Sequence, residues 1–156
     1  MGSDSDLSVM KKTGEMLDEL NIAYDITVSS AHRTPERTLK LVRDGEKKGI
    51  EVIIAGAGAA AHLAGVIASH TILPVIGVPI DSSPLNGIDS LYSTVQMPPG
   101  IPVATMAVGK AGAKNAGIFA AQIIGLKDST VAKALTAYRK KMASEVEMKA
   151  KKLEKK

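Results

Sequence analysis

The residues of this chain best suited to chemistry lie together in the segment SSAHRTP, residues 29–35. Within it, Ser30, His32 and Arg33 bring a hydroxyl, an imidazole and a guanidinium group close together in the chain. A guanidinium group offers a planar fork of donors that suits phosphate or carboxylate, and an imidazole changes its protonation near neutral pH. A lone histidine is often structural, but the place of His32 beside an arginine favours an acid/base role. We therefore expect an anion-binding site that also contains a proton-transfer group.

The first six residues, MGSDSD, form a second candidate for anion binding. They come just before a predicted helix, so their backbone N–H groups and the hydroxyls of Ser3 and Ser5 could face a phosphate, with Asp6 near ribose hydroxyls. Ordinary helix capping by serine and aspartate explains the same pattern. The sequence leaves both interpretations open.

The third candidate, residues 56–63, joins a predicted strand to a predicted helix through small residues that include Gly58 and Ala59. Residues this small let a ligand approach the backbone closely. The segment does not form a dinucleotide-binding fingerprint, because a further glycine at the required spacing is missing. His62 and Leu63 fit either the wall of a pocket or the packing of the helix start.

An alternation of helices and strands positions these three segments. The predicted strands cover residues 24–28, 50–55, 74–78 and 103–108. The first predicted helix begins near residue 6, and the following ones cover 35–48, 61–69, 89–96 and 113–124. Repeated β and α elements predict an α/β fold, with a parallel sheet between two helix layers. In such a sheet, ligands bind where the carboxyl ends of strands lead into helices, so the three segments should meet there.

The bulk composition narrows the class of protein. A chain of 156 residues with 45% hydrophobic content is expected to form one compact domain. It contains no cysteine, which excludes thiol nucleophiles, disulfides and cysteine-based metal sites. Neither a phosphate-loop motif nor paired-histidine metal spacing is present, so we expect no metal. The sequence shows neither a signal peptide nor a long apolar run, and we expect a cytoplasmic protein without membrane contact.

The net charge of +4 is concentrated at the C-terminal end. Residues 139–156 contain eight Lys or Arg against three Glu, which leaves the rest of the chain nearly neutral. Only Tyr138 lies nearby as an aromatic residue, so the basic segment lacks the stacking platform of single-strand binders. We expect a solvated helix face and no binding of nucleic acid.

An apolar stripe runs along the predicted C-terminal helix. Its members are Val131, Leu135, Tyr138, Met142 and Val146. Packing on a neighbouring subunit is the preferred explanation, and folding back over its own domain is the alternative. We therefore expect an α/β domain over residues 1–126, which carries the site, and a C-terminal helix over 127–156 for subunit packing.

Five blocks of this sequence, in order, resemble the class I PurE family, N5-carboxyaminoimidazole ribonucleotide mutase. The blocks are GSDSD at 2–6, SAHRTP at 30–35, AGAGAAAHLAG at 55–65, PLNGIDSLYSTVQMPPGIPVAT at 84–105 and AGAKNAG at 111–117. The resemblance covers residues 1–126 and implies a flavodoxin-like three-layer α/β/α sandwich, assembled as a homo-octamer. It implies an isomerase of purine biosynthesis that forms 4-carboxy-5-aminoimidazole ribonucleotide by decarboxylation and recarboxylation, without ATP, metal or organic cofactor.

Carried over position by position, the resemblance makes His32 the general acid and base. It assigns the 5′-phosphate of the ribonucleotide substrate to Ser3 and Arg33, with help from Ser5, and the ribose to Asp6. The remaining implied substrate contacts are Ser30, Gly58, Ala59, His62 and Leu63.

The chain departs from the family pattern in two places. Ala64 stands where the family has a proline. The family also has an apolar first strand running into its Met-Gly-Ser, whereas here Met1 is the first residue. Either the sequence begins late, or the sheet lacks a central strand and exposes the edges beside it.

Two other functions remain open. One is an aminoimidazole ribonucleotide carboxylase that uses CO2 directly, which a dependence on bicarbonate would distinguish. The other is a non-catalytic nucleotide-binding module of the same fold, which would not need an imidazole at His32.

Overall fold

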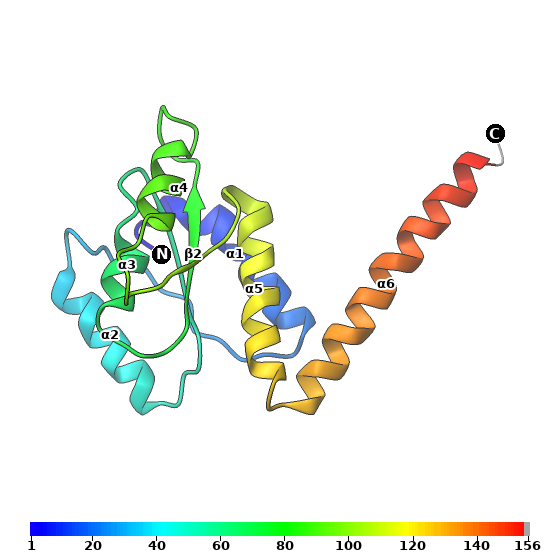
Figure 1. The fold of residues 1–156 in the computed structure, drawn as a ribbon, viewed down its shortest axis with the longest axis horizontal. Coiled ribbons are helices and arrows are strands. Elements are labelled where there is room, and N and C mark those ends of the chain that lie inside the picture. The colour runs from blue at the N-terminus through cyan, green and yellow to red at the C-terminus, as the bar shows by residue number, and fades with distance from the viewer. Residues whose placement is uncertain (155–156) are drawn as a thin grey trace.

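The computed structural model describes residues 1–154 as one α/β unit from which a long helix projects (Figure 1). The end of the predicted C-terminal region, residues 155–156, lies outside the described part of the chain. A 3-10 turn at Asp4–Asp6 opens the fold. The helices are α1 (Leu7–Glu19), α2 (Pro35–Lys47), α3 (Leu63–Ala68), α4 (Ile88–Val95), α5 (Gly109–Gly125) and α6 (Ser129–Glu154). The strands are β1 (Ile53–Gly58), β2 (Val75–Ile80) and β3 (Ala104–Thr105).

The strands form a parallel sheet in the order β1-β2-β3, with Ile53 opposite Val75 and Ile76 opposite Ala104. Every residue of β2 is buried, as expected for a strand covered on both faces. One core packs α1 and α5 against β2, and a second packs α2 and α3 against β1. The predicted α/β fold, a flavodoxin-like sandwich with an extended C-terminal helix, is confirmed.

The three strands differ from their predicted bounds, and β2 differs least, at Val75–Ile80 against the predicted 74–78. The strand expected at 50–55 lies at Ile53–Gly58, because its pairing begins where the Ile53 N–H donates to the Pro74 carbonyl at 3.0 Å. It therefore includes the first residues of the predicted small-residue turn. The strand expected at 103–108 is reduced to Ala104–Thr105.

The strand predicted at residues 24–28 is wrong. The segment belongs to no sheet, and the side chains of Tyr24 and Ile26 are 40% and 49% exposed. Alternating apolar residues do not make a strand unless a neighbouring backbone pairs with them. Within residues 1–154, Met1 alone does so: its amine donates to Thr27 O at 2.9 Å and its carbonyl accepts from Ser29 N–H at 2.8 Å. The unpaired edge expected beside MGSDSD is therefore present.

The apolar stripe of α6 divides into two halves. Val131, Leu135 and Tyr138 are buried against α1 and α5, so this half folds back over its own domain, which was the alternative interpretation. Met142 and Val146 are 41% and 66% exposed, on the half that leaves the domain (Figure 1). Only this second half remains available to a neighbouring subunit.

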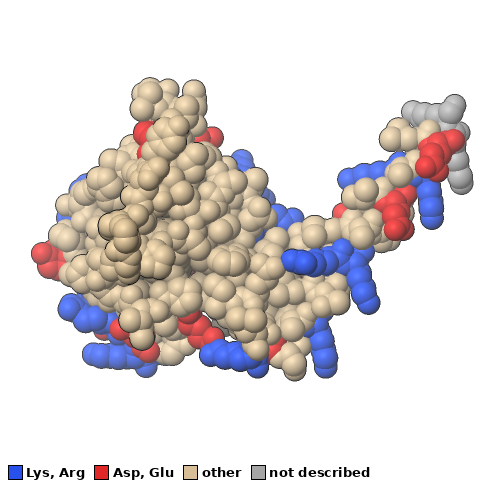
Figure 2. Space-filling view, viewed as in Figure 1, with Lys and Arg blue, Asp and Glu red and all other residues tan. Residues whose placement is uncertain are grey.

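The charged side chains of α6 lie on its exposed length, with basic and acidic groups interspersed (Figure 2). This arrangement is the solvated helix face expected from the sequence. Over residues 1–154, the helices are too short or too polar to cross a membrane.

Candidate functional site

One cavity of about 290 Å³ gathers the predicted site residues. It lies at the carboxyl end of β1, where the amino-terminal segment, the loop before α2 and the connection from β1 to α3 meet. The predicted residues that line it are Ser3, Ser5, Asp6, Ser30, His32, Arg33, Gly58, Ala59, His62 and Leu63. The structure thus brings together every residue that the sequence singled out, from three separate segments.

A closed turn presents His32 and Arg33 to this cavity. The Thr34 N–H donates to Ser30 O at 2.9 Å, and Thr34 Oγ1 accepts the Ser30 N–H at 3.0 Å. Pro35 then starts α2 at a position where a missing N–H does no harm. Because both ends of the turn are tied, the two functional side chains start from a fixed backbone.

His32 and His62 are in direct contact. Their Nε2 and Nδ1 atoms lie 2.8 Å apart, with the rings nearly perpendicular at 81°. In a hydrogen bond between two imidazoles, one nitrogen donates while the other accepts, so the tautomer of one ring fixes that of the other. Two fully protonated rings would place two donors face to face. No sequence pattern indicated this pair, because its members are 30 positions apart.

Arg33 carries the permanent positive charge of the cavity lining. Its guanidinium donates to Gly2 O and Ser30 Oγ, each at 3.4 Å, which is long for such bonds. The side chain is otherwise exposed, so most of its donors are free for an anion. No cluster of three or more His, Asp or Glu suited to a metal occurs in residues 1–154.

The amino-terminal segment is capped and also faces the cavity. The buried Asp6 carboxylate accepts the Ser3 N–H at 3.0 Å, while Ser5 Oγ donates to Ser3 Oγ at 2.9 Å. Burial raises the pKa of Asp6, although the Ser3 N–H and the Met1 amine oppose this shift. Helix capping is therefore present as a reciprocal pair of Ser3 and Asp6. The two serines also line the cavity, and phosphate binding by this segment stays a prediction.

The connection after β1 is shaped by two small residues. A Cβ added to Gly58 would lie 1.8 Å from Ser82 Oγ, so glycine is needed for this close approach. Ala59 adopts a left-handed conformation, φ +51°, which costs an alanine about 1 kcal/mol. Ser82, which sequence analysis missed, also lines the cavity. It follows the end of β2, and the strand-end rule used for the other segments could have found it.

The comparisons with known proteins agree with this geometry. The family model described as AIR carboxylase matches residues 1–145. The N5-carboxyaminoimidazole ribonucleotide mutase of Thermotoga maritima is 57% identical over 154 residues, which is 99% of this chain and 89% of that protein. The mutase of Pyrococcus horikoshii is 58% identical over 99% of this chain and 86% of its own length. The mutase of Escherichia coli K12 is 50% identical over 94% of this chain and 86% of its own length.

A solved structure shows the same arrangement. The crystal structure of Treponema denticola PurE superposes with a TM-score of 0.87 at 29% identity, covering 98% of this chain and 94% of that one. The sequence and the fold thus match the same family over nearly their whole length. This chain belongs to the AIR carboxylase family.

Proposed function

We propose that this chain is a mutase that converts N5-carboxyaminoimidazole ribonucleotide into 4-carboxy-5-aminoimidazole ribonucleotide in purine biosynthesis, in the cytoplasm. The observation that carries the proposal is the cavity where His32, His62 and Arg33 converge. It offers a proton-transfer group beside a cation, which is what a phosphorylated substrate that exchanges one proton requires. Relatives that are more than half identical over nearly the whole chain bear the name of this activity.

The reaction is an isomerisation, so its atoms balance without a co-reactant. The bond between N5 and the carboxyl carbon breaks, which leaves CO2 and an aminoimidazole. C4 of the ring then attacks CO2, and the proton on C4 must leave while N5 gains one. One imidazole, His32, can deliver the first proton and remove the second, because it is restored at the end of the cycle.

The chemistry of the other cavity residues assigns each of them to one part of the substrate. Arg33 and the hydroxyls of Ser3 and Ser5 bind the 5′-phosphate, and Asp6 lies toward the ribose. The residues that surround the imidazole and its carboxylate are Ser30, Gly58, Ala59, His62 and Leu63. The contact between His62 and His32 restricts the tautomers of His32, so that its proton-transfer nitrogen is in the required form.

An open site would lose CO2, which favours an assembly that covers it. His32, Arg33 and His62 are all exposed in a single chain, whereas recarboxylation needs CO2 and the aminoimidazole to stay together. The exposed stripe at Met142 and Val146 provides an apolar surface for a partner. We therefore include a closed homo-octamer, the assembly that the family resemblance implies, in which the exposed half of α6 packs between subunits around the domain of residues 1–126.

The test is a comparison of two substrates with the purified protein. We expect turnover of N5-carboxyaminoimidazole ribonucleotide without ATP, and no dependence of the rate on added bicarbonate. Turnover of aminoimidazole ribonucleotide with bicarbonate alone would instead identify a carboxylase. Tight ribonucleotide binding without any turnover would identify a non-catalytic binding module.

A further inference from the structure

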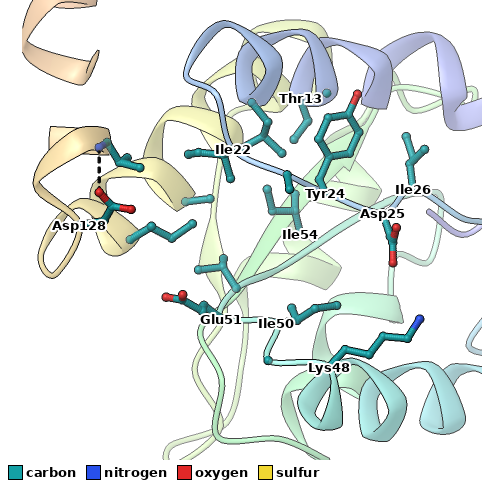
Figure 3. A pocket seen from close by; sticks show the side chains of 18 of the residues that line it. Thr13, Ile22, Tyr24, Asp25, Ile26, Lys48, Ile50, Glu51, Ile54 and Asp128 are labelled. Carbon is teal, nitrogen blue, oxygen red and sulfur yellow. Dashed lines mark hydrogen bonds between the residues drawn. The ribbon is translucent and has the colours of Figure 1, made fainter. Parts of the chain in front are cut away.

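The turn that follows β1, residues 58–61, leads directly into His62 and lines the cavity around His32. Beside the first half of β1 lies a separate cavity of about 460 Å³, with Ile22 and Ile54 among its lining side chains (Figure 3). This second cavity shares no lining residue with the cavity around His32, so it does not reach the turn. The turn is instead contacted from the side of β2, against which α4 packs (Figure 1).

The turn adopts a conformation that its own residues do not favour. Ala59 is left-handed, with φ +51°, where the Cβ of an alanine comes too close to the following carbonyl oxygen. The helix that follows, α3, is short, and its N-cap residue His62 makes no side-chain capping bond. A strained conformation persists only where surrounding contacts enforce it. The turn therefore needs a restraint from another element.

Ser93 of α4 supplies that restraint. Its hydroxyl oxygen accepts the Ala61 N–H at 2.9 Å. Ala61 is 1% exposed, so its N–H is out of reach of water and depends on this bond. The one hydroxyl proton lies within reach of Asp89 O, at 2.8 Å, and of Ala59 O, at 3.4 Å. Within residues 1–154, this is the only side chain outside the turn that hydrogen-bonds to the backbone of residues 59–62.

α4 is itself tied to the sheet, so Ser93 starts from a fixed backbone. The fully buried Ser90 donates to Ile80 O, at the end of β2, at 2.9 Å. Thr105 Oγ1, on β3, donates to Thr94 O at 3.2 Å. These two bonds join α4 to β2 and β3, and Ser93 joins it to the turn after β1. One helix thus holds the carboxyl ends of the three strands in place.

The place of Ala61 decides where His62 lies. The two residues are consecutive, and the His62 N–H donates to Ala60 O at 2.8 Å, so the backbone of His62 moves with the turn. Its Nδ1 lies 2.8 Å from His32 Nε2, and a displacement of about 1 Å would break this bond. Because the bond decides which nitrogen of His32 carries the proton, a shift of the turn changes the acid/base group from a distance.

We propose that Ser93 is a positioning residue for the reaction, whose hydroxyl holds the turn after β1 so that His62 keeps His32 in the tautomer that transfers the proton. The effect on turnover rests on the proposed mutase function, whereas the effect on the two imidazoles rests on the hydrogen bonds alone. Ser93 does not line the cavity, so it acts without touching the substrate. Arg33 lies on a different loop, so phosphate binding is independent of Ser93.

The first test is the kinetics of Ser93→Ala in the full chain, which should fold because alanine is a good helix former. We expect kcat to fall by about tenfold or more, with the ribonucleotide Kd changed by less than about threefold, because a proton transfer worth about 10² to 10⁴ in rate is misaligned rather than removed. Ser93→Thr keeps the hydroxyl and should recover most of the lost kcat. Thr94→Val is the matched control: it removes a hydroxyl that bonds only to Ser90 O, within the same helix, and should leave kcat nearly unchanged.

Imidazole NMR supplies the second measurement, which needs no turnover. With isotope-labelled histidine, the chain gives signals from His32, His62 and His70 only. In Ser93→Ala, the ring-nitrogen shifts of His32 and His62 should move toward those of averaged tautomers. Those of His70 should stay in place, because its contacts lie at the other end of α3. Thr94→Val should leave all three sets of signals unchanged.

The two measurements separate this inference from the mutase function. An unchanged kcat in Ser93→Ala would overturn the inference, and so would a lower kcat with unmoved imidazole signals, because the loss would then be general destabilisation. A loss of equal size in Ser93→Thr or Thr94→Val would also overturn it. An unsubstituted protein without any turnover would overturn the mutase function, and the imidazole signals of Ser93→Ala would then decide the role of this hydroxyl by themselves.

Discussion

Replacing His32 by glutamine separates catalysis from binding and folding. The side chain is exposed, and its hydrogen bond is to His62 at 2.8 Å, which a glutamine amide can replace. The unfolding free energy should therefore change by less than about 0.5 kcal/mol. Glutamine cannot carry a proton between C4 and N5, and loss of general acid/base catalysis costs about 10² to 10⁴ in rate. That range corresponds to about 2.7 to 5.5 kcal/mol of lost transition-state stabilisation.

The assay combines turnover with ribonucleotide affinity. In His32→Gln the dissociation constant of the ribonucleotide should change by less than about tenfold, or about 1.4 kcal/mol, because Arg33 and not His32 is assigned to the phosphate. His70→Gln is the matched control, since His70 is an exposed histidine that contacts Val66 O and Ser69 Oγ rather than the cavity. Turnover of His32→Gln within a factor of ten of the unchanged protein would refute the acid/base assignment.

Four further changes test other parts of the site and the assembly. Arg33→Ala should weaken ribonucleotide binding by about 1.5 to 3 kcal/mol with little change in melting temperature, and an unchanged affinity in calorimetry would remove Arg33 from the phosphate site. Gly58→Ala should lower both stability and activity, because its Cβ would meet Ser82 Oγ, and the added change Ser82→Ala should restore the melting temperature. Burial raises the pKa of Asp6, so the folded state holds this proton more tightly than the unfolded state, and the unfolding free energy falls as pH rises above 3.8 and the carboxyl ionises. Asp6→Asn removes this group, and the fall of the unfolding free energy over that pH range should then be smaller. Deleting residues 139–156 spares the buried half of α6, so the shortened chain should still fold. It should form a smaller particle in light scattering and have lower activity, and an unchanged particle size would exclude a role of this segment in assembly.

The sequence was sufficient to locate the cavity because its residues follow one topological rule. The chain start and the end of β1 each lead into a helix at one of the predicted segments, and the third segment joins the extended residues 24–28 to α2. Local patterns such as Pro35 after SAHRT mark the helix starts well. What the sequence could not show is contact between segments. The pairing of His32 with His62, and the approach of Ser82 to Gly58, depend on side-chain placement across different loops.

The errors in the prediction have a related cause. Sequence periodicity indicates which face of a strand or helix is apolar, but it does not indicate what pairs with or packs against that element. The alternation at Tyr24 and Ile26 is correct for a strand with one covered face, but no ladder forms because, within residues 1–154, Met1 alone pairs with the segment through its backbone. The α6 stripe likewise continues past Tyr138 to Val146, although the domain covers only its first half. In both cases the apolar pattern is present, and no surface within residues 1–154 covers it.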